Sequence, residues 1–346
     1  MLSRYGRKAL AVGALAFCLC FASAGAGFGD ESLNAVFADR GWQSAHFQDH
    51  ELAGVIWSPR RNQRLSFEAY QAAIGSADLV LLGEVHTNPD HHLLQAEALG
   101  YVVDSGRTPA VVFEMISRDL SSRLEAALTE NPRDWQGLGD ALSWEARGWP
   151  SWDIYAPIAR VALENGLTIL PGDLSRDDIR TISRDPGNLT EDLAVITGTA
   201  RPLRAASRMS LDDQLFRSHC ELVPRDAIAP MRQVQIGRDA ALTASLAAGM
   251  NRVGRDNGAV LIAGAGHTRR DWGVPWHLAE HLPDVSILSV AFIEVAEGMN
   301  APADYFPETE NGRGVYDIIV FTPRADVTDH CAGLRERFNT SKDASE

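Results

Sequence analysis

Histidine and carboxylate side chains follow four apolar segments of this sequence, and together they could hold a metal ion or move protons. Neutral imidazoles and carboxylates suit zinc, manganese or iron, and an imidazole beside a carboxylate can act as a general base. The sequence contains no His-Glu-x-x-His motif, so spacing alone does not define a metal site. The residues concerned are Glu84 and His86, Glu114, Asp173, and His267.

The segments that precede these residues have the character of buried strands. They alternate with stretches of helical spacing, which predicts an α/β fold, a mainly parallel sheet flanked by helices. Because the carboxyl ends of parallel strands share one edge of a sheet, we expect the ionisable side chains to converge there. For Asp173 the alternative is a simple helix cap, and for Glu84 a buried carboxylate satisfied by hydrogen bonds. The strands are expected at 79–82, 109–113, 167–170, 258–263, 285–290 and 316–321.

Helices are expected between these strands, and one long segment breaks the alternation. Ser66 should cap a helix that runs through Ile74, and Pro157 suits the first turn of another. Residues 174–257 are rich in Arg and Asp and indicate a helical insertion. The other helices are expected at 91–103, 120–128 and 233–250, with a short edge strand at 54–58.

Two adjacent histidines open the helix expected at 91–103. Neighbouring helical residues point to different faces, so at most one of His91 and His92 should face the site beside His86. We expect the other to be solvated or to pack locally.

The N-terminus indicates export. A basic segment, the apolar run 9–21 and Ala22-Ser23-Ala24 form a signal-peptide pattern, with an uncleaved anchor as the alternative. Cys18 and Cys20 each follow a bulky residue, which does not favour lipid anchoring. Cys220 and Cys331 could pair in an oxidising compartment or remain free. The expected divisions are a signal peptide at 1–24, an N-terminal extension at 25–65, an α/β domain at 66–325 and a tail at 326–346.

Charge excludes one class of partner. The formal net charge is −14, and cleavage after Ala24 would remove three basic residues and take it to −17. Nucleic-acid binding depends on Lys and Arg, so this acidic chain is not expected to bind nucleic acid. A Gly-x-Ser-x-Gly motif is absent, which argues against a serine hydrolase.

Residues after the strand expected at 258–263 could contribute to a binding site. Gly264-Ala265-Gly266-His267 is not a dinucleotide fingerprint, but its glycines would let the backbone approach a ligand. Arg269 and Arg270 could pair with a carboxylate or could simply be solvated. Trp272 and Trp276 could line an apolar pocket or could be core residues.

Several motifs, taken in order, resemble the ChaN-like haem-binding uptake family of the Tiki and erythromycin-esterase superfamily. The resemblance spans roughly residues 70–325 and includes the expected site residues. The motifs are Leu82-Gly83-Glu84-Val85-His86 with His91, His92 and Gln95; Phe113-Glu114-Met115; Trp152-Asp153-Ile154-Tyr155; Gly264-Ala265-Gly266-His267 with Gly273-Val274-Pro275; and Val315-Tyr316-Asp317 with Phe321-Thr322-Pro323.

The resemblance implies an exported or membrane-anchored, iron-regulated protein that binds haem. A haem site between two protomers is one arrangement that it implies. Candidate iron ligands are His86, His267 and Tyr155; Arg269 or Arg270 would meet the propionates, and Trp272 would line the pocket. A homodimer and a haem-uptake receptor are the candidate partners.

Other members of the superfamily are hydrolases, so the same residues support an alternative. A metal-dependent peptidase or esterase would use Glu84, His86, Glu114 and His267 to activate water, with zinc or manganese held by Glu84, His86 and His267. A scaffold whose partner binds this edge is a third interpretation. The choice of haem over hydrolysis rests on the family resemblance.

Overall fold

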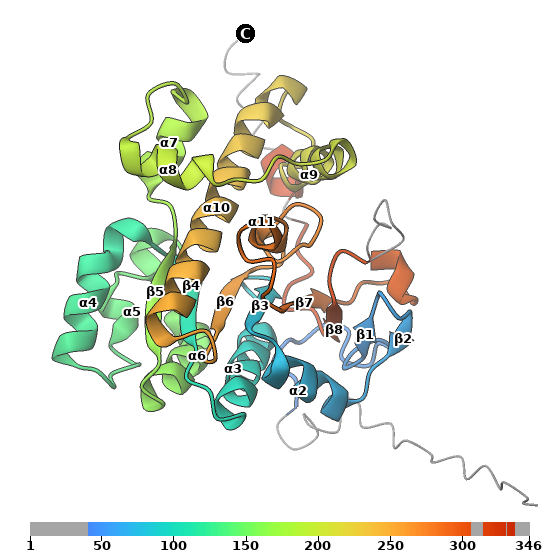
Figure 1. Cartoon of the computed structure of the whole chain (residues 1–346). Helices are drawn as coiled ribbons and strands as arrows, with labels where there is room; N and C mark the ends of the chain where they lie inside the picture. Colours follow the sequence, from blue (N-terminus) through green and yellow to red (C-terminus); the bar gives the residue numbers. More distant parts are fainter. Residues whose placement is uncertain (1–40, 306–313, 330, 336–346) are drawn as a thin grey trace, which may run out of the picture. The chain divides into compact units, whose positions relative to one another are not determined.

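A mixed, mostly parallel sheet is the centre of the computed structural model, which describes residues 41–305, 314–329 and 331–335 (Figure 1). Eight strands in the described part follow the order β2-β1-β8-β7-β3-β6-β4-β5. Strands β3 to β8 run parallel to one another, and β1 and β2 join antiparallel beside β8. This arrangement confirms the predicted α/β fold. The strands are β1 (Ile56–Ser58), β2 (Gln63–Arg64), β3 (Leu79–Glu84), β4 (Ala110–Ser117), β5 (Thr168–Asp173), β6 (Ala259–Gly264), β7 (Ile287–Glu294) and β8 (Ile318–Thr322).

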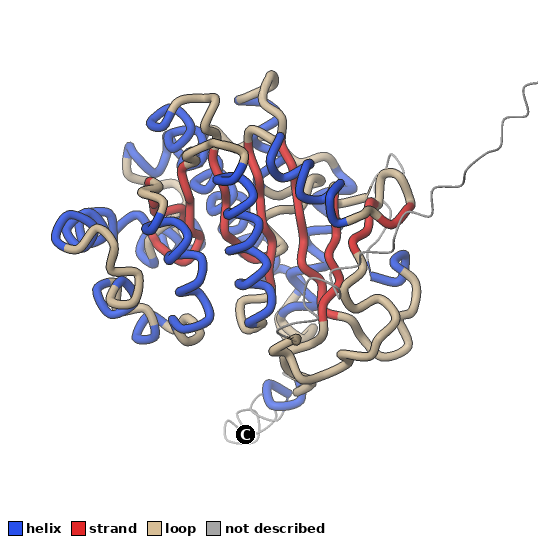
Figure 2. The backbone as a smooth tube through the Cα atoms, turned by 90° about the horizontal axis from the view of Figure 1, so that it is seen from below, coloured by secondary structure: helices blue, strands red, loops and turns tan. Residues whose placement is uncertain are grey.

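Helices cover both faces of the sheet, as the tube in Figure 2 shows. On one face, β3, β4 and β6 contribute residues to a core shared with α2, α3 and α6. On the other face, the same strands pack against α10 and α11. The helices are α2 (Phe67–Ser76), α3 (Pro89–Asp104), α4 (Ser121–Glu130), α5 (Leu138–Ala141), α6 (Trp152–Glu164), α7 (Arg176–Arg184), α8 (Glu191–Gly198), α9 (Ala205–Ser218), α10 (Ile228–Val253) and α11 (Val274–His281).

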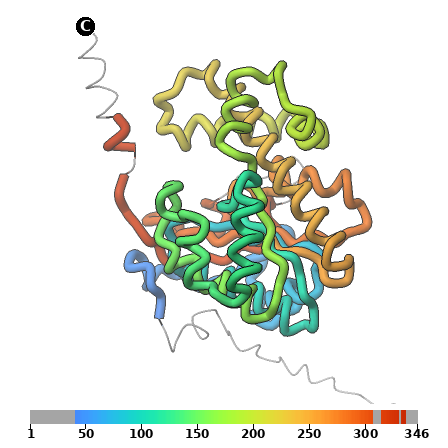
Figure 3. Tube along the Cα trace, turned by 90° about the vertical axis from the view of Figure 1, so that its left-hand side faces the viewer, coloured from blue at the N-terminus to red at the C-terminus, as the bar shows by residue number. Residues whose placement is uncertain are grey.

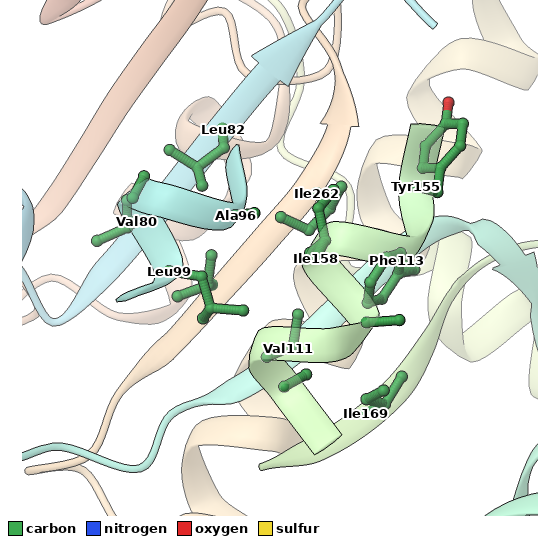
Figure 4. Close-up of a cluster of buried hydrophobic side chains, with 14 of the residues drawn as sticks. Val80, Leu82, Ala96, Leu99, Val111, Phe113, Tyr155, Ile158, Ile169 and Ile262 are labelled. Atoms are coloured by element: carbon green, nitrogen blue, oxygen red, sulfur yellow. The ribbon is translucent and has the colours of Figure 1, made fainter. Parts of the chain in front are cut away.

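The central strands are apolar on both faces because both faces are covered. All six residues of β3 are buried, with Val80 and Leu82 in one core and Leu79 and Leu81 in the other. Figure 4 shows the first of these cores, in which α6 presents Tyr155 beside the strand ends. A buried hydrophobic side chain contributes about 1.5–3 kcal/mol, so these cores hold the strand ends in place.

The predicted helical insertion contains α7, α8, α9 and α10, and Figure 3 shows the first three together at the top of the view. Its last helix returns to the sheet. Leu242, Leu246 and Met250 of α10 pack on β3, β4 and β6, while the preceding turns of the helix pass the carboxyl ends of the strands. One helix therefore connects the insertion to both the core and the expected site.

Two elements differ from the sequence expectation. Helix α6 begins at Trp152, so Pro157 lies inside it and not in its first turn. Ser151 caps the helix by accepting from the Asp153 amide, and the buried face that includes Tyr155 outweighs the hydrogen bond that proline cannot donate. Strand β4 continues to Ser117, which places Glu114 within the strand.

A disulfide joins two distant parts of the chain. Cys220 and Cys331, whose pairing the sequence left open, form a disulfide that connects the end of α9 to the segment after β8. None of the described helices is long and apolar enough to cross a membrane. The expected signal peptide lies outside the described residues.

Candidate functional site

The carboxyl end of β3 places an imidazole beside a carboxylate. Glu84 is the last residue of β3, and its Oε1 accepts a hydrogen bond from His86 Nδ1 at 2.8 Å. Tyr155 donates its hydroxyl to the same oxygen at 3.1 Å. Because Nδ1 is engaged, Nε2 is the nitrogen that His86 has available for a ligand.

Helix α3 provides a residue that contacts both members of this pair. Asn88 caps the helix by accepting from the amides of Asp90 and His91. His92 Nε2 lies 3.2 Å from Glu84 Oε2 and 3.1 Å from the His86 carbonyl oxygen. His91 turns the other way, where Nδ1 accepts from the Val85 amide at 2.9 Å. Both histidines are fully buried, so of the two alternatives expected for the second histidine, solvation or local packing, the structure shows local packing.

Glu114 joins the pair to the neighbouring strands. Its Oε2 accepts from the Gly264 amide of β6 at 2.7 Å. Its Oε1 lies 2.7 Å from Arg238 Nη2, 3.3 Å from His267 Nε2 and 3.8 Å from His86 Nε2. One carboxylate therefore contacts three cationic or titratable groups.

His267 is fixed from both sides. Nδ1 donates to Asp239 Oδ1 at 2.6 Å, and Gln235 lies 3.1 Å from the same nitrogen. Nε2 faces Glu114. Only 6 % of the side chain is exposed, so neither nitrogen is free for an incoming ligand.

Asp173 belongs to the same network and does not cap a helix. Its Oδ2 accepts from Arg238 Nε at 2.8 Å, whereas α7 is capped by Ser175. Arg238 consequently bridges Asp173 and Glu114. The structure thus brings together the side chains from all four predicted strand ends.

The electrostatics of the cluster favour protonated imidazoles. Burial lowers the pKa of His86, but the carboxylates of Glu84 and Glu114 outweigh it and raise the pKa to about 9. Burial also lowers the pKa of His267, and Glu114 and Asp239 raise it to about 10. Burial raises the pKa of Glu114, yet the charges of His267 and His86 outweigh it and hold that pKa well below the ordinary value.

Burial raises the pKa of two other groups. The Tyr155 hydroxyl has a pKa far above its ordinary value, because burial and the Glu84 charge both oppose ionisation. Asp173 has a raised pKa because its burial outweighs the charge of Arg238. Tyr155 is therefore a hydrogen-bond donor at neutral pH and not a phenolate.

His86 is more exposed than the carboxylates beside it. Its side chain is 34 % exposed, against 0 % for Glu84 and 2 % for Glu114. Trp149 stands edge-on to the imidazole with the ring centroids 5.1 Å apart. A ligand that reaches the site therefore meets His86 beside an aromatic ring.

Two glycines let the strand and the loop approach each other here. A Cβ at Gly83 would lie 2.3 Å from Thr268 Oγ1 and 2.8 Å from Ala265 Cα, so a side chain there would displace the loop that carries His267. A Cβ at Gly264 would lie 3.2 Å from His86 Nε2. Glycine at 264 therefore leaves space in front of the available nitrogen.

Three predicted binding residues lie outside the cluster. Arg269 is buried and its guanidinium is bound to Asp271, while Arg270 is bound to Asp317 at 2.6 Å. Trp272 is 1 % exposed and lies beneath the Arg269 guanidinium. These side chains already have partners within the fold.

Sequence reasoning missed four residues of the site. Gln235, Arg238 and Asp239 come from α10, and Trp149 precedes α6. The spacing of Gln235 and Asp239 places them on one face of a helix that was correctly expected, which was the signal available. Nothing local indicated that this face would meet the strand ends.

An imidazole with these properties can donate a proton as a general acid, or can offer Nε2 to a metal ion after losing that proton. Within residues 41–305, 314–329 and 331–335, no group of three or more His, Cys, Asp or Glu side chains is arranged to hold a metal ion. The expected zinc or manganese site of Glu84, His86 and His267 is therefore not supported by a preformed ligand cage.

The fold and this site define an α/β protein with a buried histidine–carboxylate cluster at the carboxyl edge of its sheet. A family model described as haem-binding uptake, Tiki superfamily, ChaN matches residues 71–278, which is more than half of the chain. The chain belongs to this family.

Two solved structures are similar to this chain, and the first of them supports the fold. The structure of ChaN of Campylobacter jejuni with cofacially bound heme shares 20 % identity, covers 77 % of this chain and 95 % of its own, and has a TM-score of 0.58. A mutant of the erythromycin esterase EreC in its open conformation shares 14 % identity over 80 % of this chain and 99 % of its own, with a TM-score of 0.44. No curated protein matches the chain.

Proposed function

We propose that this protein binds haem at the carboxyl edge of the sheet, with His86 as the iron ligand. The geometry of His86 carries the proposal. Its Nδ1 is held by Glu84, as the second nitrogen of a metal-binding histidine commonly is, and its side chain is 34 % exposed.

The two other candidate ligands fit less well. Tyr155 is fully buried and donates its hydroxyl to Glu84, with a pKa that opposes the phenolate form. His267 has both nitrogens engaged, by Asp239 and Glu114. Of the three, only His86 has a candidate ligating atom without a short hydrogen bond, since Glu114 Oε1 lies 3.8 Å from its Nε2.

The surroundings of His86 also suit a flat apolar ligand. Trp149 is partly exposed beside the imidazole and offers an aromatic surface. When bound, the haem iron would supply a coordination position for imidazole. Glu84 would keep the ring oriented, and Tyr155 would keep Glu84 in place. Membership of a haem-binding family supports the same assignment.

Titration of the purified protein with haem tests this. A Soret band shifted from that of free haem should saturate near equimolar ligand, and His86→Ala should weaken the shift. His219→Ala is the matched control, because His219 is exposed at the end of α9 and bonds only locally. An unshifted spectrum, or a His86→Ala spectrum identical to that of wild type, would refute the assignment.

We further propose that the protein is exported to the periplasm and takes part in haem or iron uptake. The N-terminal signal pattern and the Cys220–Cys331 disulfide support export, since disulfides persist in oxidising compartments. Osmotic-shock fractionation tests the location. Light scattering with and without haem tests for a homodimer, and capture of a membrane receptor by the haem-loaded protein tests the second partner.

Hydrolysis of an ester or peptide is a second candidate function, and the His86–Glu84 pair is the observation that favours it. A partly exposed imidazole with a pKa of about 9 can protonate a leaving group, and Glu114 lies 3.8 Å from its Nε2. A panel of ester and peptide substrates tests this function, with and without added zinc or manganese. Turnover that survives His86→Ala would argue against it.

A further inference from the structure

A groove of about 760 Å³ lies in the helical insertion and shares no residue with the histidine–carboxylate cluster. Its wall is formed by α7, α8, the 199–204 segment, the start of α9 and one side of α10. Ile182, Leu189, Leu203 and Ile236 give it an aliphatic lining. The volume lies within the range of small-molecule sites, about 300–1,000 Å³.

The chemistry of the lining differs from that expected of a haem site. Among the described residues that line the groove, none is aromatic and none is His, Cys or Met. The groove therefore offers neither a ring to stack on nor a ligand for iron. An aliphatic chain is the apolar group that this surface matches.

The charge of the lining is the opposite of the charge of the chain. Arg201, Arg208 and Arg232 line the groove, and the described lining includes no Asp or Glu, although the sequence has 46 acidic and 32 basic residues. Arg201 is paired with Glu280, and Arg232 with Asp212. Arg208 is exposed and has no ionic partner within the described ranges, so one cation remains for a ligand.

The groove is already formed in this structure. Its floor lies on a small core that contains Ile182 and Leu193. The 199–204 segment is held by α11, where the Arg201 amide donates to His277 Nδ1 at 3.0 Å. The Arg201 guanidinium also stacks over Trp276 at 3.9 Å from the ring centroid. A preformed wall reduces the ordering cost of binding.

We propose that this groove binds a long-chain aliphatic carboxylate, with its alkyl chain against Ile182, Leu203 and Ile236 and its carboxylate at Arg208. The positive charge of Arg208 favours an anionic ligand, and the aliphatic lining favours an alkyl chain. The site is separate from the one proposed for haem.

Fluorescence titration with dansyl-undecanoate tests the proposal. We expect saturable enhancement, displaced more effectively by dodecanoate than by the uncharged dodecanol. Ala194→Trp should weaken probe binding at least tenfold, because Ala194 lines the groove and is exposed, so an indole fills the space without entering the core. Val195→Trp is the control, since Val195 is 63 % exposed and outside the lining.

A charge-reversal pair tests the role of Arg208. Arg208→Glu should weaken binding about fivefold, the scale of an exposed ion pair near 1 kcal/mol, while Arg217→Glu on the same helix should leave it unchanged. Absence of saturable binding, or equal binding by the Ala194 and Val195 variants, would overturn the proposal. Loss of the haem Soret shift in Ala194→Trp would overturn the separation of the two sites.

Discussion

Replacement of Arg238 by methionine tests whether the cluster is held by its central cation. The guanidinium bridges Glu114 and Asp173, and the Arg238 side chain is 21 % exposed. Removal of one partner of a buried ion pair costs about 3–5 kcal/mol, because the remaining charge is left uncompensated. Methionine retains the aliphatic packing, so the loss reports mainly on charge.

The two carboxylates should respond differently. Glu114 keeps His267 and the Gly264 amide, whereas Asp173 keeps the hydrogen bond from the Leu174 amide. Most of the destabilisation should therefore come from the uncompensated charge of Asp173. We expect the unfolding free energy to fall by about 3 kcal/mol, the lower end of this range. That is a large part of a typical unfolding free energy of about 5–15 kcal/mol.

The loss should depend on pH in a defined direction. Burial raises the pKa of Asp173, and removal of Arg238 takes away the nearby charge that lowers it. Between the unfolded and the folded pKa, the folded variant binds more protons than the unfolded chain, so its stability falls as pH rises. Destabilisation should be smaller at about pH 5 than at about pH 8, because a neutral Asp173 costs less to bury.

Urea unfolding followed by tryptophan fluorescence measures this effect, since the chain has eight tryptophans. Addition of Asp173→Asn to Arg238→Met removes the uncompensated charge and should recover much of the lost stability. A loss below about 1 kcal/mol at both pH values, or additive losses in the double variant, would refute this reasoning.

Three further predictions follow from contacts in the structure. Gly83→Ala should destabilise the fold by about 1–3 kcal/mol in urea unfolding, because its methyl would overlap Thr268; unchanged stability would contradict this. Gly264→Ala should weaken the haem Soret shift with little loss of stability, because its methyl would lie 3.2 Å from His86 Nε2; an undiminished shift would count against His86. Cys220→Ser should lower the melting temperature by opening a disulfide with a separation of 111 residues, with a chain-entropy limit of about 5 kcal/mol; a melting curve equal to that of wild type would exclude this contribution.

Much of the fold was predictable because its signals are local. A continuous apolar run indicates a strand covered on both faces, and helical spacing between such runs indicates crossovers. Parallel strands end at one edge, so Glu84, Glu114, Asp173 and His267 were expected to meet there, and they do. Pro157 was misplaced because the burial of a whole helix face outweighs one missing hydrogen bond.

The partners of these side chains depended on the tertiary structure. Arg238 and Asp239 lie on a helix after a long insertion, and only the return of α10 to the sheet brings them to the strand ends. For the same reason, the disulfide and the engagement of Arg269 by Asp271 could not be predicted from sequence. The sequence determined by itself which groups lie at the edge of the sheet, since strand direction follows from local pattern. The tertiary structure decided which of them are buried, paired and protonated, because those properties depend on neighbours distant in the chain.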